Sequence, residues 1–175
     1  MTTLVAFSGS TRSASFHTRI INAMAGLAPA GVRIALFDLS DVPFYNQDLE
    51  GDNVPESVHA LRTAVTEADG VIFAAPEYNG SYSALTKNTV DWLSRPMGQG
   101  VLKGKRAIVV SATPGPGGGQ RVSEQLTALL GFFGNEVVGK ITSATVHEKM
   151  ATDSDEIVDP ELAGQLREAL ATFGA

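Results

Sequence analysis

Short apolar runs alternate with amphipathic stretches along most of the chain. Four runs of strand length contain mainly apolar residues, at positions 4–7, 32–37, 71–75 and 107–110. Most are continuous rather than alternating in polarity, which is typical of parallel strands that are covered on both faces. A weaker candidate lies within residues 136–146, where Gly139 and Lys140 interrupt the apolar pattern. The pattern therefore predicts five strands.

Amphipathic helices are predicted between and after these runs. Three apolar stripes recur at helical spacing: Val58, Leu61, Val65 and Ala68; Val122, Leu126, Leu129, Leu130 and Phe133; and Leu162, Leu166, Ala169, Leu170 and Phe173. Asp159-Pro160 fits the N-cap and first position of the last helix, and Gly134 fits the residue after a helix end. Two more helices are expected, one after Ser15 and one after the turn at Pro76. The chain thus alternates strand and helix five times.

This alternation predicts the fold class. Strands that alternate with helices form a parallel sheet with right-handed crossovers. Five strands suit an α/β, flavodoxin-like, doubly wound parallel sheet of order 2-1-3-4-5, with helices on both faces. The length of 175 residues is close to that of one typical domain, and no linker separates two halves. We therefore expect residues 1–175 to form a single domain.

The composition excludes several classes of function. The chain has no cysteine, so disulfides, thiolate metal sites and thiol nucleophiles are ruled out, and a redox role needs a bound cofactor. No metal site is expected, because His59 and His147 have no partner at ligand spacing. A net charge of −6, without a basic run longer than a pair, disfavours nucleic acid and anionic membranes as partners. No signal-peptide pattern or apolar run of membrane-spanning length is present, which predicts a cytoplasmic protein.

Candidate chemistry lies in the loops that follow the strands, because doubly wound sheets bind ligands beyond the carboxyl ends of their strands. The first such loop, residues 8–17, is rich in hydroxyl side chains, carries Gly9 and Arg12, and leads into a helix. Hydroxyls, backbone N–H groups and a guanidinium at a helix N-terminus can together hold a phosphate. A solvated turn with an ordinary helix cap is the alternative. The loop matches neither the glycine-rich dinucleotide fingerprint nor a P-loop.

Two further loops have unusual compositions. Residues 76–81 combine Pro, Asn and Gly, which favours a bent chain whose amides can face the edge of a planar ring, although a simple tight turn is the alternative. Residues 111–119 have little side-chain bulk, so a flat ring could lie against their backbone, although a flexible surface loop has the same composition. Three such loops at one sheet edge predict a ligand with a phosphate at one end and a planar ring at the other, for which FMN is the natural candidate.

At these same loops the chain resembles a known family. Residues 9–17 resemble the phosphate loop of the NADPH-dependent FMN reductase family, a flavodoxin-like group that includes chromate, quinone and azo reductases. Residues 76–81, continuing through 87–88 and 91–95, are similar to the second signature of that family, and residues 115–121 to its third loop. The resemblance extends in order over most of the chain.

The resemblance implies a set of cofactor-binding residues. They are Ser10, Arg12, Ser15, Phe16 and His17 at the FMN phosphate, Pro76, Glu77, Tyr78, Asn79 and Gly80 along the isoalloxazine, and Ser111, Thr113 and Gly115 over another part of it. His17 stands where the family usually has Asn, and Ser83-Ala84 stand in place of Pro-Gly. The histidine is expected either to alter the affinity for phosphate or to make phosphate binding depend on pH, because an imidazole can gain a proton near neutral pH beside a dianion.

The resemblance also implies an activity. It is that of an FMN-containing oxidoreductase: a nicotinamide from NADPH or NADH passes hydride to flavin N5, leaves, and a quinone, chromate, azo compound or free flavin then takes the electrons. Because this chemistry belongs to the flavin, no catalytic acid or base side chain is expected. Family members form dimers or tetramers, and the apolar loop at residues 44–49 is a candidate contact for a homodimer or homotetramer.

Two other functions remain open from the sequence. A flavodoxin-type electron carrier would dock protein partners and turn over no small substrate. Such carriers usually have a phosphate loop without arginine and a strongly acidic rim, whereas this chain has Arg12 and a net charge of only −6. A flavin-binding regulator with little turnover is the third hypothesis.

Overall fold

The central element is a five-stranded parallel sheet with strand order β2-β1-β3-β6-β7. It is described here from a computed structural model that covers residues 1–174. The strands are β1 (Thr2–Ser8), β2 (Val32–Phe37), β3 (Gly70–Ala74), β6 (Arg106–Ala112) and β7 (Glu136–Ser143). Numbered among themselves, the five strands have the order 2-1-3-4-5, so the predicted doubly wound, flavodoxin-like topology is confirmed.

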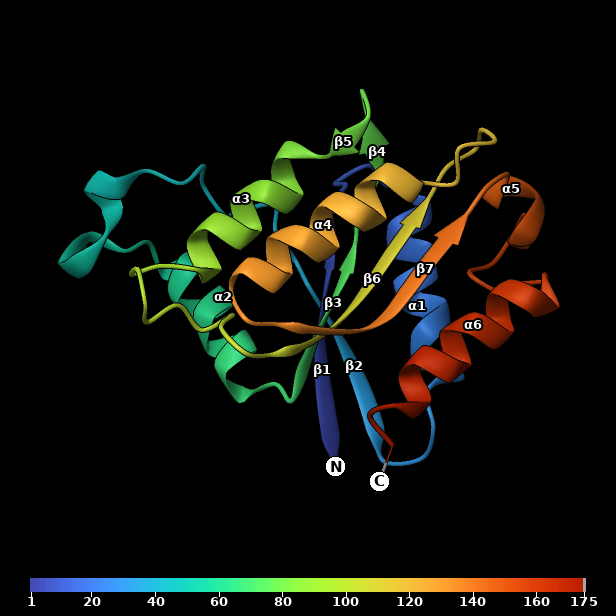
Figure 1. Cartoon of the computed structure of the whole chain (residues 1–175), viewed down its shortest axis with the longest axis horizontal. Helices are drawn as coiled ribbons and strands as arrows, with labels where there is room; N and C mark the ends of the chain where they lie inside the picture. Colours follow the sequence, from blue (N-terminus) through green and yellow to red (C-terminus); the bar gives the residue numbers. More distant parts are fainter. Residues whose placement is uncertain (175) are drawn as a thin grey trace.

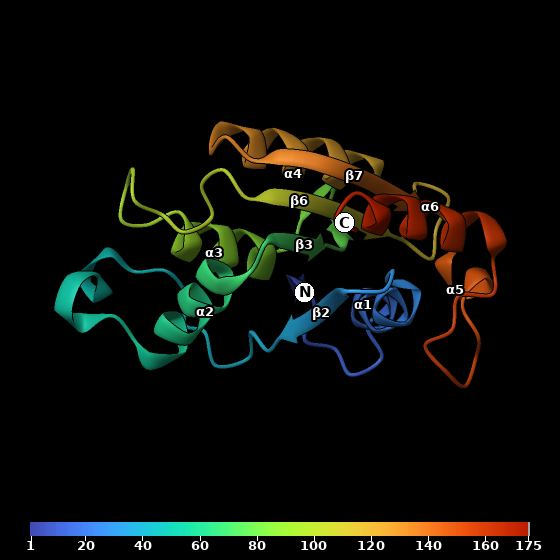
Figure 2. The ribbon, with the colours of Figure 1, turned by 90° about the horizontal axis from the view of Figure 1, so that it is seen from below.

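Helices cover both faces of this sheet (Figures 1 and 2). The helices α1 (Phe16–Leu27) and α6 (Pro160–Ala171) pack on one face, and α2 (Glu56–Glu67), α3 (Ala84–Leu93) and α4 (Gln120–Phe132) pack on the other. Asp159 caps α6 by accepting a hydrogen bond from the Leu162 N–H, and Gly134 has a φ of +76° just past the end of α4. Both helix boundaries agree with the predictions from the sequence.

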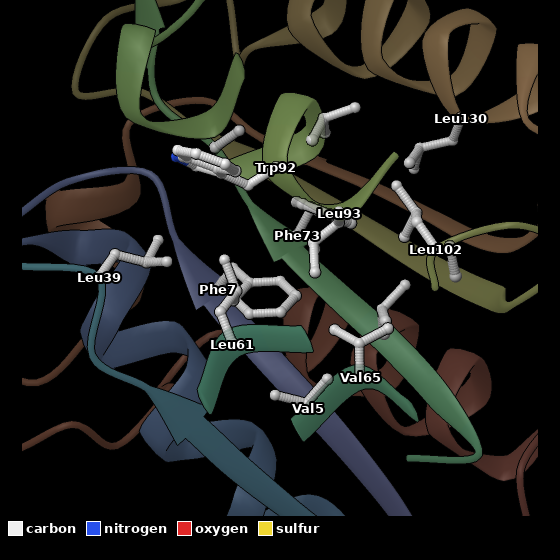
Figure 3. Close-up of a cluster of buried hydrophobic side chains, with 14 of the residues drawn as sticks. Val5, Phe7, Leu39, Leu61, Val65, Phe73, Trp92, Leu93, Leu102 and Leu130 are labelled. Carbon is white, nitrogen blue, oxygen red and sulfur yellow. The ribbon is translucent and has the colours of Figure 1, made fainter. Parts of the chain in front are cut away.

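The core on the α2, α3 and α4 face surrounds buried aromatic side chains (Figure 3). Phe7 and Phe73 from neighbouring strands lie with their ring centroids 5.2 Å apart. Trp92 is fully buried, and its indole N–H donates to the carbonyl oxygen of Pro43. Trp92 is therefore a core residue, and its polar atom holds the loop that follows β2.

The interruption in the fifth apolar run has a packing explanation. β7 continues through Gly139 and Lys140, with an irregularity in its pairing where Ala107 and Ile108 lie opposite. A Cβ on Gly139 would lie 2.7 Å from the Cβ of Ala169 in α6. The glycine thus allows α6 to approach the sheet closely.

Short elements that the apolar pattern did not predict complete the chain. They are the 3-10 turns η1 (Gln47–Leu49) and η2 (Gly51–Asn53), the two-residue strands β4 (Glu77–Tyr78) and β5 (Ser81–Tyr82), and α5 (Val146–Lys149). The antiparallel β4–β5 hairpin lies directly after β3, at the edge toward which the strands point in Figure 1. The second candidate loop is therefore a hairpin rather than a simple turn before a helix.

Candidate functional site

The three candidate loops meet at a cavity of about 210 Å³ beyond the carboxyl ends of β1, β3 and β6. Its lining is Ser10, Arg12, Ser15, Phe16 and His17 from the first loop and α1, Pro76, Glu77 and Tyr78 from the second, and Ala112, Thr113 and Pro114 from the third. A neighbouring cavity of about 420 Å³ shares Ser10 and Arg12 and extends toward the end of β2. The expected convergence of the loops at one sheet edge is thus present.

The first loop exposes a cationic and hydroxyl-bearing turn. The Ser15 N–H donates to the carbonyl oxygen of Arg12, and the Arg12 N–H donates to Ser10 Oγ. These hydrogen bonds form a tight turn before α1. Residues 11–14 are exposed, whereas Ser15 is buried and caps α1 by accepting from the Thr18 N–H. The guanidinium of Arg12 lies 6.0 Å from the centre of the Phe16 ring. Within residues 1–174, no carboxylate forms an ion pair with Arg12.

His17 is held inside the site rather than at its surface. It is buried in the first turn of α1, and its Nε2 accepts a hydrogen bond of 3.2 Å from the Ala112 N–H. Burial lowers its pKa to about 4; the charge of Arg12 lowers the pKa as well, and a hydrogen bond with the Ala75 backbone opposes the shift. The imidazole is therefore neutral near pH 7. This lowered pKa opposes the proton uptake near neutral pH that the sequence suggested, because a buried imidazolium would lose its hydration.

The second loop is a tight hairpin anchored to α4. Asn79 and Gly80 have φ values of +54° and +79°, the left-handed pair that a two-residue hairpin turn of type I′ requires. Gln125 in α4 donates to the Gly80 carbonyl oxygen and accepts from the Ser81 hydroxyl. Glu77 and the exposed Tyr78 line the cavity, while Asn79 and Gly80 at the tip do not. Tyr78 is thus available to cover a planar ligand at the mouth.

Arg121 at the start of α4 brings a second cation to the rim of the site. Its guanidinium lies 3.9 Å from the Glu77 carboxylate and close to Gly80. The pair is weak, since the Arg121 side chain is largely exposed to solvent.

The third loop places its polar side chains in structural roles. Ser111 is fully buried and donates to the Ala75 carbonyl oxygen at 2.7 Å, so it does not line the cavity. Thr113 does line it, and its hydroxyl donates to the Gly115 carbonyl oxygen and accepts from the Gly118 N–H. Gly115 is exposed and lies outside the lining.

Some residues of the site carried no signal in the sequence. Ala112 and Pro114 line the cavity although their side chains bear no polar group, so only the fold identifies them. Ser83 is buried; its hydroxyl donates to the Gly9 carbonyl oxygen, accepts from the Thr86 N–H, and so joins the first loop to α3. Serine at position 83, noted in the sequence only as a departure, is explained by this double role as helix cap and loop anchor.

Two other kinds of site were searched for within residues 1–174. They contain no group of three or more His, Asp or Glu side chains arranged to hold a metal ion. No helix in this part of the chain has the length and apolarity that crossing a membrane requires.

Comparison with known proteins identifies close relatives. The family model described as NADPH-dependent FMN reductase matches residues 2–149. An NAD(P)H-dependent FMN reductase of Pseudomonas aeruginosa is 37% identical over 130 residues, which cover 74% of this chain and 70% of that protein. A quinone reductase of Escherichia coli is 31% identical over 175 residues, covering 98% of this chain and 93% of that protein.

A solved structure agrees with these matches over the whole fold. The flavoenzyme NAD(P)H:(acceptor) oxidoreductase FerB from Paracoccus denitrificans superposes with a TM-score of 0.84 at 31% sequence identity. The superposition covers 99% of this chain and 95% of FerB.

Proposed function

The chain belongs to the NADPH-dependent FMN reductase family and is a quinone reductase-like oxidoreductase, and from that premise we propose that it binds FMN where the three loops meet and reduces a small acceptor. When bound there, FMN would supply the two-electron redox chemistry that links NADPH or NADH to a quinone, chromate, azo compound or free flavin in a ping-pong cycle. The whole of residues 1–175 then acts as one FMN-binding domain.

The observation that carries this proposal is the exposed turn at Arg12. Among residues 1–174 the Arg12 guanidinium has no carboxylate partner. Together with the exposed hydroxyls and the N-terminus of α1, it matches the donors that a phosphate requires. In the proposed arrangement Ser10 and Arg12 bind the phosphate, and the buried Ser15 holds the end of α1 in place.

The ring end of the cofactor is assigned to the other two loops. Pro76, Glu77 and Tyr78 of the second loop and Thr113 of the third loop line the cavity. Tyr78 can cover a ring face and exclude water from it. Backbone N–H groups near Tyr78 and Thr113, which line the cavity, would offset negative charge that develops on a reduced ring. No side chain is assigned a catalytic acid or base role.

The test of this function is direct. The purified protein is expected to be yellow or to quench the fluorescence of added FMN, and to oxidise NADPH or NADH when a quinone is supplied. A panel of acceptors then identifies the preferred oxidant, and the two nicotinamide nucleotides are compared by kcat/KM. A colourless protein that leaves FMN fluorescence unchanged would contradict the proposal.

The alternative of an electron carrier is tested by the same material. A flavodoxin-type carrier would bind FMN but oxidise almost no NADPH unless a partner reductase were added. The position of Arg12 in the phosphate turn and the relationship to reductases favour the enzyme.

Assembly as a homodimer or homotetramer is part of the proposal. Phe44, in the apolar loop after β2, is 76% exposed, and Phe132 at the end of α4 is 82% exposed. Phe132 also borders a groove of about 570 Å³ between the ends of α3 and α4. Exposed aromatic side chains of this kind are typical of subunit contacts. Light scattering coupled to size-exclusion chromatography measures the assembly, and Phe44→Ser and Phe132→Ser are expected to weaken it.

A further inference from the structure

The hydrogen-bond ladder between β3 and β6 ends at a histidine. The Ala75 N–H donates to the Val110 carbonyl oxygen, so in a regular parallel ladder the next bond would join the Ala112 N–H to the Ala75 carbonyl oxygen. Instead, the Ala112 N–H donates to Nε2 of His17, and the Ala75 carbonyl oxygen accepts from the Ser111 hydroxyl. A side chain from α1 thus takes the place of a backbone partner where the two strands separate.

The neutral form of the imidazole is required for this contact. An Nε2 atom that accepts a hydrogen bond carries no proton, so the proton of the neutral ring is on Nδ1. Protonation of Nε2 would remove the acceptor and leave the buried Ala112 N–H facing a donor.

The surroundings hold the ring in that form. His17 is buried in the first turn of α1, where the helix dipole disfavours a positive charge. The positive charge of Arg12 in the first loop lowers the pKa of His17, because it would repel a protonated ring. Glu77 in β4 lines the same cavity, and the neighbouring ends of β3 and β6 present backbone groups.

We propose that His17 is a positioning residue for the flavin: its unprotonated Nε2 fixes the point at which β6 leaves β3 and thereby sets the width of the cavity between Pro76 and Ala112. The inference rests on the proposed function, which assigns the flavin ring to the part of the cavity lined by the second and third loops. It differs from the role that the resemblance implied, because His17 acts through the backbone of Ala112 rather than on the phosphate.

The protonation state and tautomer of the His17 imidazole are tested first, in the protein without any cofactor. The chain has three histidines, so a protein labelled with ¹⁵N-histidine gives three imidazole spin systems, and a His17→Gln sample identifies the signals of His17. We expect His17 to be a neutral Nδ1–H tautomer at pH 7 and to remain so at pH 5.5. A charged ring or an Nε2–H tautomer at pH 7 would overturn the proposal.

The positioning role is tested with two flavins. Riboflavin has the same ring as FMN but no phosphate, so a change in the ring site affects the binding of both. His17→Leu is expected to lower the affinities for FMN and for riboflavin by the same factor. That factor is about tenfold, because a buried N–H is left without an acceptor. His17→Gln carries a carbonyl oxygen that can accept from Ala112 and should recover most of the affinity.

Arg12→Gln is the matched comparison, because it should lower the affinity for FMN and leave the affinity for riboflavin unchanged. If His17→Leu lowered the affinity for FMN but not for riboflavin, His17 would act on the phosphate and the proposal would be wrong. If the wild-type protein bound neither flavin, the proposed function would fail, whereas the nitrogen signals would still report the state of His17. Should His17→Leu not fold, as judged by near-UV circular dichroism, the nitrogen signals and His17→Gln decide the matter.

Discussion

Two groups of polar residues at the same edge of the sheet have different roles. The exposed turn, residues 11–14, points into solvent and keeps Arg12 without a carboxylate partner among residues 1–174. The buried junction, made of His17, Ser83 and Ser111, has its polar atoms bonded to the backbones of Ala112, Gly9 and Ala75. Polar residues at the edge of a sheet are therefore of two kinds, those free to bind a ligand and those that hold the loops in place.

The comparison predicts that changes at the buried junction cost folding stability and changes in the exposed turn cost ligand affinity. The largest effect is expected for Gly119→Ala. Gly119 has a φ of +82°, and a Cβ there would lie 2.1 Å from the Ser111 hydroxyl oxygen. Left-handed strain and overpacking together should lower the free energy of unfolding by about 4 kcal/mol, measured by urea denaturation.

Gly117→Ala is the control for that substitution, since a Cβ at Gly117 would meet nothing within 4 Å. It should change stability by less than about 0.5 kcal/mol. Equal effects of the two substitutions would show that the junction around Ser111 is loosely packed.

The second prediction concerns the pH dependence of stability. The unfolded chain binds a proton on histidine near pH 6.5, whereas folded His17 resists protonation down to about pH 4. Between these values the unfolded state binds more protons, so stability falls as the pH is lowered through this window, by up to about 3 kcal/mol.

His17→Gln should remove that part of the pH dependence, as measured by urea unfolding at pH 7.0, 5.5 and 4.5. His147→Gln, which changes an exposed histidine, should retain the wild-type slope. If stability depended on pH in His17→Gln as it does in the wild-type protein, the proton uptake would belong to another group.

The third prediction tests the exposed turn. Arg12→Gln should lower FMN affinity about 30-fold, corresponding to loss of about 2 kcal/mol of charge-assisted hydrogen bonding, and should leave the urea midpoint nearly unchanged. FMN fluorescence quenching measures the affinity. Arg167→Gln makes the same charge change on an exposed residue of α6 and should leave FMN binding intact. A large loss of stability in Arg12→Gln would remove the distinction between the turn and the junction.

The smallest predicted effect is that of Ser111→Ala. Removing its hydroxyl deprives the buried Ala75 carbonyl oxygen of a donor, which should cost about 1 kcal/mol of stability. Ser13→Ala in the exposed turn should leave the free energy of unfolding almost unchanged. Thermal or urea unfolding of both variants measures the difference. If Ser13→Ala were the more destabilising of the two, the assignment of roles would be reversed.

Much of the fold was predictable from local pattern. Continuous apolar runs and helical stripes predicted the five main strands and their order, and the Asp159-Pro160 cap marked the start of α6. The β4–β5 hairpin was missed, because strands of two residues are too short for an alternating pattern, and Asn79-Gly80 alone also fits a simple turn.

The position of the cavity was predictable from the sequence, but the residues that line it were not predictable in detail. Arg12, Tyr78 and Thr113 line the cavity as residues of three converging loops. Ser111 was expected beside the ring, yet its hydroxyl is turned to the Ala75 carbonyl oxygen inside the protein. Residue type alone does not distinguish these outcomes, since a serine hydroxyl suits a ligand and a backbone carbonyl equally well.

The sequence by itself determined the α/β fold and the sheet edge at which the three candidate loops meet, because apolar periodicity and loop composition are properties of neighbouring residues. Only the tertiary structure decided which polar groups remain free. His17 and Ala112 are 95 positions apart, and their contact exists because α1 and the end of β6 are packed together. That packing removes water from the imidazole, and the loss of hydration makes the histidine neutral.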